Sequence, residues 1–231
     1  MEGSGNMAQK LMAELQTETA FTIPVFGGIP VPESVAVTWL IMALLTVVSI
    51  LLTRHLSVDK PGKVQIVLEG GIGWLYSFFG DILGERGKQY IPWLATVTIY
   101  IGCANMTGLI GLKPPTKDLN VTAGLAVMSI VLIEYSGLHI KGGKGFVHSF
   151  AEPMPLLAPI NVLELFIKPL SLCMRLFGNV LGAFVVMELI KLCMPAFMPV
   201  PFSMYFDIFD GLIQAYVFVF LTSLFMKEAM E

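Results

Sequence analysis

The chain has 231 residues, of which 55% are hydrophobic and only 13% are charged. Its mean hydropathy of +0.77 lies far outside the range of a water-soluble domain of this size. The formal net charge of −3, without a basic patch, also excludes a nucleic-acid-binding protein. The composition therefore predicts an integral membrane protein.

Residues 1–33 are expected to form an outer N-terminal segment ahead of the first membrane span. Residues 1–20 carry Glu14 and Glu18 and lack a compact apolar core, so they do not indicate a cleavable signal peptide. The stretch FTIPVFGGIPVPE (21–33) is rich in proline and glycine, which is typical of an ordered approach to the membrane surface.

Five stretches are apolar enough to cross a bilayer as α-helices, which takes about 20 residues for about 30 Å of hydrocarbon. We expect these spans at about 34–54, 89–112, 119–140, 160–191 and 200–227. Residues 64–80 (VQIVLEGGIGWLYSFFG) are apolar but contain Glu69 and several glycines, so we expect an interfacial amphipathic segment there, with a sixth span as the alternative. The predicted fold is a single all-α membrane domain whose last two helices are long and strongly tilted.

The distribution of lysine and arginine predicts the orientation, because cytoplasmic loops of membrane proteins carry an excess of these residues. An N-terminus outside and a C-terminus inside place eight of them on the inner side and four on the outer side. The eight are Arg54, Lys60, Lys63, Arg86, Lys88, Lys141, Lys144 and Lys227, and the four are Lys10, Lys113, Lys117 and Lys191.

The fourth span contains an arginine within an apolar stretch, KPLSLCMRLFGNVLG (168–182). A charge at the bilayer centre costs about 2.5–3.5 kcal/mol, so such a residue usually faces protein or water and has a function. Arg175 lies eleven residues after Glu164, about 16 Å along a helix, which is too deep for its head to reach the interface easily. The alternative is a snorkelling side chain.

Helical periodicity places the polar residues of this span on one face. A stripe about 100° wide holds Glu164, Lys168, Ser171, Arg175, Gly178, Asn179 and Gly182. Gly178 and Gly182 form a small-xxx-small pair beside the arginine, which allows another helix to approach closely, either from a partner or within this chain. Pro169 is expected to kink or loosen the helix.

The last span carries three polar residues within about 60° of one another, namely Asp207, Asp210 and Gln214. Two carboxylates at positions i and i+3 repel each other when both are ionised, which suits a proton or cation path. The alternative is that both lie in water at the outer interface. In the fourth span, Glu188 is turned by about 140° from Arg175 and cannot pair with it within the helix. Glu134 is the single charge between Leu119 and Ile140.

The sequence predicts no catalytic site, cofactor or metal in this chain. It contains no GxxxxGK[ST] loop for a nucleotide. Cys103, Cys173 and Cys193 occur without CxxC spacing or clustered histidines, so we expect three buried thiols.

Three stretches resemble the membrane subunit a of the F-type ATP synthases. PINVLELFIKPLSLCMRLFGNVLG (159–182) is similar to the signature around that family's essential arginine, and GLIQAYVFVFLTSLFMKEAME (211–231) to its closing helix. GLKPPTKDLNVTAGLA (111–126) is similar to the loop into an earlier span. The resemblance runs in order from about residue 20 to the C-terminus.

The resemblance implies roles for individual residues. Arg175 matches the arginine that faces the ring of c subunits, with Ser171, Gly178 and Gly182 on the same approach. Asn179 follows it in the signature, and Gln214 matches a glutamine that lies near it. Asp207 matches a variable, often ionisable position of a half-channel.

The chain departs from the family at one position. Many members carry a glutamate nine residues after the arginine, where this chain has Phe184. Glu188, one turn further and about 40° away around the axis, is the expected substitute. The candidates for the outer half-channel are therefore Asp207, Asp210 and Glu188, and those for either path are Glu134 and Glu164.

The implied function is that of a stationary subunit whose two half-channels and arginine couple proton or sodium flow to rotation of the c-ring during ATP synthesis. The implied partners are the c-ring, b-type peripheral stalk subunits, the lipid bilayer and, indirectly, the F1 head. The expected location is a bacterial cytoplasmic membrane, with an organellar membrane as the alternative. Two rival functions are a stand-alone transporter that uses Arg175 as counter-ion for a small anion, and a membrane scaffold.

Overall fold

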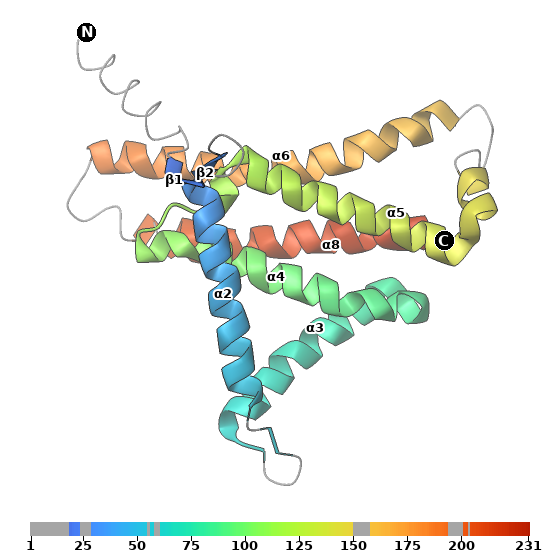
Figure 1. The fold of residues 1–231 in the computed structure, drawn as a ribbon, viewed down its shortest axis with the longest axis horizontal. Helices are drawn as coiled ribbons and strands as arrows, with labels where there is room; N and C mark the ends of the chain where they lie inside the picture. Colours follow the sequence, from blue (N-terminus) through green and yellow to red (C-terminus); the bar gives the residue numbers. More distant parts are fainter. Residues whose placement is uncertain are drawn as a thin grey trace.

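Helices make up nearly all of the computed structural model, which describes residues 19–23, 29–54, 56–57, 61–149, 158–193, 201–202 and 204–231 (Figure 1). The long helices are α2 (Glu33–Thr53), α3 (Lys63–Gly87), α4 (Ile91–Met106), α5 (Leu119–Ser149), α6 (Ala158–Cys193) and α8 (Gly211–Met230). The short ones are η1 (Lys88–Tyr90), η2 (Thr107–Ile110), η3 (Pro115–Lys117) and the π-helical η5 (Met204–Asp210). By length and composition, five stretches of the described chain could cross a membrane, which confirms the predicted all-α membrane fold.

A short antiparallel strand pair, not expected from the sequence, precedes the first span. It consists of β1 (Thr19–Ile23) and β2 (Ile29–Pro32), with Ile23 opposite Ile29. β2 leads directly into α2, whose first residue, Glu33, lies 3.8 Å from the ammonium group of Lys113. Residues 1–18 and 24–28 of the predicted N-terminal segment lie outside the described residues.

Helix α2 runs at a steep angle to α4, α6 and α8 (Figure 1). Most of its large apolar side chains are exposed, and it packs on α4 through a small cluster of Val37, Ile41 and Ala104. At 21 residues, or about 32 Å, it is just long enough to cross the hydrocarbon core without tilting.

The predicted interfacial segment, residues 64–80, lies within the longer helix α3. The helix continues to Gly87 with a break at Gly84, whose φ of 65° is accessible to glycine at little cost. The turn at η1 then reverses the chain, so that α3 and α4 meet at one end of the molecule (Figure 1). Val64, Val67 and Trp74 are exposed, whereas Phe79, Leu83 and Gly87 in the last part of α3 are buried. The location of α3 at the membrane surface stays a prediction.

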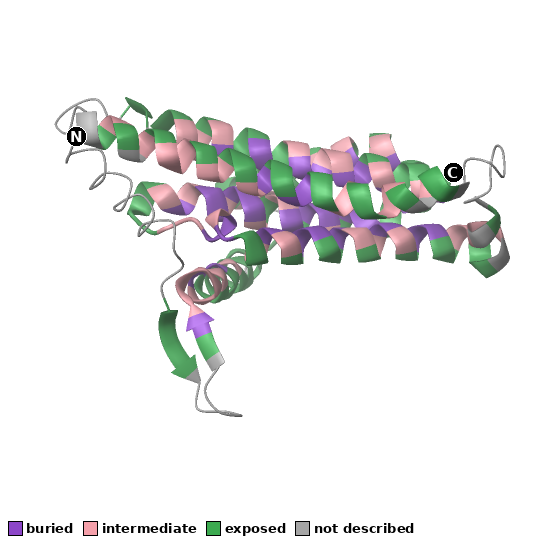
Figure 2. Cartoon of the chain, turned by 90° about the horizontal axis from the view of Figure 1, so that it is seen from above, coloured by how far each residue is buried: buried purple, intermediate pink, exposed green. Residues whose placement is uncertain are grey.

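Helices α4, α5, α6 and α8 run roughly alongside one another and enclose the core (Figure 1). The core includes Leu94, Ile101, Ile133, Leu176 and Phe218, all almost fully buried. Figure 2 shows buried residues where these helices face one another and exposed residues on the outer faces. Because many of the exposed side chains are large and apolar, the outer faces suit lipid rather than water.

Helix α6 is far longer than a bilayer is thick. Its 36 residues extend about 54 Å, against about 30 Å of hydrocarbon, so a single crossing requires a steep tilt. The predicted tilt of the last two helices is supported by this length and by their direction relative to α2 (Figure 1). The helix runs unbroken through Pro169, where the sequence predicted a kink or loosening.

The cysteines differ in burial. Cys173 is buried, with its sulfur 3.6 Å from the hydroxyl of Thr122, as predicted for a buried thiol. Cys103 is only half-buried, because it lies on the side of α4 that α2 covers incompletely. The side chain of Cys193 lies outside the described residues.

The close approach of α5 and α8 depends on a glycine. A Cβ at Gly137 would lie 2.9 Å from the carbonyl oxygen of Ala229, so any larger residue forces the two helices apart. We expect Gly137→Val to destabilise the chain by about 1–3 kcal/mol, measured as a lower melting temperature in detergent and less chain in the membrane. Gly124→Val is the matched control, because a Cβ at Gly124 in the same helix meets no atom within 4 Å. Equal stability of the two variants would contradict the prediction.

Candidate functional site

Helix α6 has one buried face and one exposed face. Leu172, Cys173 and Leu176 are buried against the bundle. The exposed face carries much of the predicted stripe, namely Ser171, Arg175, Gly178, Asn179 and Gly182. A Cβ at Gly178 or Gly182 would meet no atom within 4 Å, so neither glycine is used for packing in the described chain. This face can therefore receive a closely approaching partner.

Arg175 lies near the middle of α6 and is exposed on this face. No described carboxylate lies within ion-pair distance of its guanidinium group. A charge in the middle of a membrane helix is costly when nothing balances it. The arrangement therefore leaves the guanidinium free to interact with an acidic group outside this chain.

Asn179, one turn after Arg175, connects α6 to the last helix. Its amide nitrogen donates to both carboxylate oxygens of Asp210, at 3.2 and 3.3 Å, and to the side-chain oxygen of Gln214 at 3.1 Å. Gln214 is only 4% exposed, and its own amide nitrogen has no hydrogen-bond partner in the described chain. The sequence placed these three residues on two separate faces, and the structure joins them into one polar group.

The turn before α8 differs from the predicted α-helix. Residues Met204–Asp210 form a π-helix, which has more residues per turn than an α-helix. The carboxylate of Asp207 therefore lies beside Gly108 of η2, whereas Asp210 faces Asn179 of α6. The two carboxylates do not share the narrow face that an α-helix would give them.

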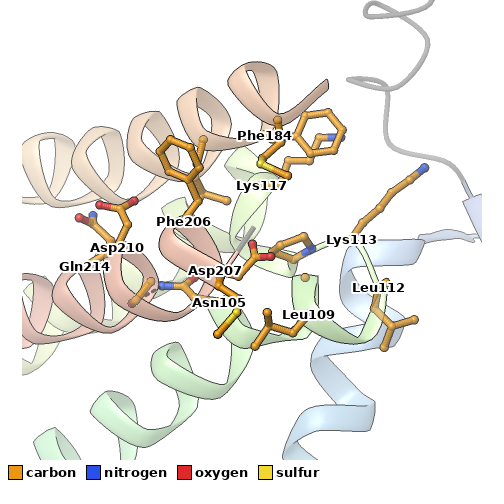
Figure 3. Close-up of a pocket in the computed structure, with 18 of the residues that line it drawn as sticks. Asn105, Leu109, Leu112, Lys113, Lys117, Phe184, Phe206, Asp207, Asp210 and Gln214 are labelled. Carbon is orange, nitrogen blue, oxygen red and sulfur yellow. Dashed lines mark hydrogen bonds between the residues drawn. The ribbon is translucent and has the colours of Figure 1, made fainter. Parts of the chain in front are cut away.

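Both aspartates nevertheless line the same cavity, whose volume is about 700 Å³ (Figure 3). Its wall is formed by the end of α4, η2, the loop that leads into α5, the C-terminal part of α6, and η5 with the start of α8. Gln214 lies beside Asp210, on the side of the cavity away from Lys113 (Figure 3). The cavity therefore brings polar groups of the last two helices into reach of a small ion.

Three lysines also line this cavity, namely Lys113, Lys117 and Lys191. The ammonium group of Lys117 lies 3.4 Å from the centre of the Phe184 ring, a cation–π contact that joins the loop before α5 to α6 (Figure 3). All three were predicted on the outer side, and the structure places them at one end of the bundle. The start of α2 lies at the same end, since Glu33 is close to Lys113.

A second polar cluster lies toward the opposite end of α6. The ammonium group of Lys168 lies 3.5 Å from the carboxylate of Glu164 and 3.1 Å from that of Glu228 in α8. Glu134 of α5 is close enough for an electrostatic interaction with this lysine. The side chain of Lys168 is 19% exposed. Three helices thus place three carboxylates around one cation.

Arg175 lies between the two clusters along α6. Lys168 precedes it by seven residues, or about 10 Å, and Asn179 follows it by four residues, or about 6 Å. The two polar clusters are therefore offset along the helix, with the arginine between them.

Comparison with known proteins identifies the family. The family model described as ATP synthase A chain matches residues 35–227. ATP synthase subunit a of Moorella thermoacetica is 41% identical over 197 residues, which cover 85% of this chain and 89% of that protein. The chain belongs to the ATP synthase subunit a family. A further member, ATP synthase subunit a 1 of Hahella chejuensis, is 35% identical over 206 residues, with coverage of 89% and 87%. The sodium-ion-specific subunit a of Propionigenium modestum is 32% identical over 216 residues, with coverage of 87% and 74%.

This member of the subunit a family departs from the family signature at Phe184, which lies in α6. Phe184 lines the cavity beside Lys117, where a glutamate would bring a carboxylate. The backbone of Glu188 lies one turn further along α6, and its side chain lies outside the described residues. Its substitution for the missing glutamate stays a prediction.

Several residues near the site were not singled out from the sequence. Asn105 and Thr116 form a buried hydrogen-bonded pair at the cavity wall, and Glu228 pairs with Lys168. An asparagine within the apolar run 89–112 was a usable signal, because a buried amide needs hydrogen-bond partners. No local sequence pattern indicated that Lys117 contacts Phe184, that Thr116 binds Asn105 or that Glu228 pairs with Lys168.

Proposed function

We propose that this chain is the stationary ion-translocating subunit of an F-type ATP synthase. In this function two half-channels and Arg175 couple ion flow to rotation of a c-ring, with b-type peripheral stalk subunits as further partners and the F1 head attached indirectly. The observation that carries the proposal is an arginine without an ion-pair partner among the described residues, on a glycine-lined face of α6 between two offset polar clusters. The family assignment supports the same function.

The cavity is the proposed outer half-channel. An ion that enters between the lysine-lined loop and η5 meets Asp207 and then the group of Asp210, Asn179 and Gln214. Asn179 lies on the exposed side of α6, so this group connects the cavity with the face that carries Arg175. A carboxyl on a c subunit that passes this face can receive the ion there.

Arg175 is the proposed separator of the two paths. A carboxyl on the ring must be neutral while it faces lipid, since an isolated buried charge is too costly. A guanidinium remains charged at every accessible pH and stabilises the ionised carboxylate beside it, so the ion is released there. The same positive charge repels a cation moving directly from one half-channel to the other.

The Lys168 cluster is the proposed inner half-channel. Its carboxylates, Glu134, Glu164 and Glu228, offer successive acceptors on three helices. The cluster lies toward the C-terminal end of the chain, opposite the cavity. With an outside N-terminus and an inside C-terminus in a bacterial cytoplasmic membrane, the cavity end with Lys113, Lys117 and Lys191 faces outward and the Lys168 cluster lies toward the inside.

The coupling ion is either a proton or a sodium ion. The name of the Propionigenium modestum relative specifies sodium, and that of the Moorella thermoacetica relative specifies no ion. Measuring ATP-driven uptake with each ion in turn, using the assembled complex in vesicles, identifies the ion.

The proposal is tested by comparing the purified chain with the assembled complex in lipid vesicles. We expect no ion or anion uptake by the chain alone and ATP-driven ion uptake by the complex. Anion uptake by the chain alone would instead support a stand-alone transporter with Arg175 as the counter-ion.

Substitution of Asp210 tests the proposed outer half-channel at a single residue. Asp210→Leu removes the carboxylate that accepts from the Asn179 amide and leaves only the Gln214 oxygen as acceptor, so we expect ATP-driven pumping to fall by about tenfold or more, as for a lost proton-transfer group. Asp210→Asn keeps an acceptor and should retain more activity. The matched control is Asp81→Leu, since Asp81 is exposed on α3, away from the cavity. Equal pumping by Asp210→Leu and Asp81→Leu would show that Asp210 is not part of the outer half-channel.

A further inference from the structure

The π-helical turn η5 carries an aspartate into the cavity and has to be held in place by its neighbours. π-Helices are rare, form mostly single turns and occur often at functional sites. None of the seven residues of η5 is buried, so the turn has no core of its own. What fixes its conformation must therefore lie at its contacts with other elements.

Asn105, at the end of α4, contacts the junction between η5 and α8. Its amide nitrogen donates to the backbone carbonyl of Gly211 at 2.9 Å, and its side-chain oxygen accepts from the hydroxyl of Thr116 at 2.7 Å. Asn105 is 4% exposed and Thr116 is fully buried. A carbonyl can only accept, so the amide nitrogen must face Gly211, and both ends of the amide are used.

Two glycines allow the last helix to lie this close to α4 and η2. A Cβ at Gly211 would lie 2.9 Å from the Cβ of Asn105, and one at Gly108 would lie 2.7 Å from a carboxylate oxygen of Asp207. The turn is therefore in close contact with neighbouring elements at two points. Asn105 binds its C-terminal end, and the bare backbone of Gly108 receives the carboxylate of Asp207 in its middle.

We propose that Asn105, oriented by Thr116, is a positioning residue that holds η5 in its π-helical form and thereby places Asp207 at the cavity. This inference rests on the proposed function of the cavity as the outer half-channel. Without the bond to Gly211, the junction can relax toward an α-helix, which rotates Asp207 relative to Asp210 and Gln214. The amide acts on the ion path through the backbone of the turn.

The test uses the assembled complex in vesicles and measures ATP synthesis against the ion concentration on the cavity side. We expect Asn105→Leu to lower the rate at limiting ion concentration by about tenfold and to raise the ion concentration for half-maximal rate. The dependence on the ion concentration of the opposite side should not change. A merely structural role would reduce the amount of complex and scale all rates equally, and that result would overturn the proposal.

Thr116 offers a matched pair of variants if Asn105→Leu does not assemble. Thr116→Val keeps the shape but loses the hydroxyl that orients the amide, whereas Thr116→Ser keeps the hydroxyl. We expect the half-maximal ion concentration to shift with Thr116→Val and to return to the wild-type value with Thr116→Ser. Wild-type ion dependence for both assembled variants would overturn the proposal.

A labelling experiment separates this inference from the proposed function. In a chain whose native cysteines are replaced, Asp207→Cys is labelled from the cavity side with a water-soluble thiol reagent. We expect Asn105→Leu to change the labelling rate by about fivefold or more, and an unchanged rate would overturn the positioning role. If Asp207→Leu and Asp210→Leu both pump normally, the outer half-channel itself is wrong, whatever the labelling shows.

Discussion

Arg175→Ala is expected to abolish ATP-driven ion pumping while the complex stays assembled. Without the fixed positive charge, nothing on α6 stabilises an ionised carboxylate of the ring, because no described cation lies closer along this face than Lys168, about 10 Å away. We expect pumping to fall by about a hundredfold or more, the range found when a central electrostatic group is removed. Fold stability should change little, since the side chain is exposed and makes no ion pair in the described chain.

The passive ion leak distinguishes the two proposed tasks of the arginine. If its charge keeps ions from passing directly between the offset clusters, Arg175→Ala should raise the leak through complexes that hydrolyse no ATP. Arg175→Lys keeps a positive charge without the planar donor group, so we expect a low leak but poor pumping. A leak that is low for both variants would contradict the separator role and leave only the role in ion release.

The matched control is Arg86→Ala, because Arg86 is also exposed but lies at the end of α3. ATP-driven uptake, ATP hydrolysis and passive leak are recorded in the same vesicles for all variants. Wild-type pumping by Arg175→Ala would mean that this arginine is a snorkelling or packing residue, and the proposed mechanism would fail.

The exposed face of α6 could be predicted because it depends only on the spacing of residues within one helix. Ser171, Arg175 and Gly178 recur at helical spacing, and a regular helix places such residues on one side wherever it lies. The apolar runs that mark the helices are equally local, because each run only has to match the thickness of a bilayer. The structure adds that no neighbouring helix in the described part of the chain packs against the glycines of this face.

The wall of the cavity could not be predicted in the same way. Asp207 and Asp210 separate because η5 is π-helical, and that turn depends on Asn105, which is about a hundred residues distant in sequence. Likewise, Lys168 meets Glu228 through the packing of α6 on α8. Such contacts depend on how the helices pack, and helical periodicity in one segment contains no information about its neighbour.

Gly178→Leu is the second change with a large expected effect, because it tests whether the glycine face binds a partner. In the described part of the chain a Cβ at Gly178 meets no atom within 4 Å, and leucine favours helix formation over glycine by roughly 1 kcal/mol. The variant chain should therefore fold and insert normally. If a c-ring helix packs closely against this face, a leucine one turn from Arg175 must push it away or block its movement.

We expect Gly178→Leu to lose nearly all ATP-driven pumping, together with either slower ATP hydrolysis or loss of the c-ring on purification. Slower hydrolysis would indicate a ring that is docked but cannot turn, whereas loss of the ring would indicate that close approach at Gly178 is needed for docking. The matched control is Gly124→Leu on α5, where a Cβ is equally unobstructed but lies outside the proposed ring face. Normal pumping by Gly178→Leu would show that no partner approaches α6 closely here, and the ring would have to meet Arg175 from another side.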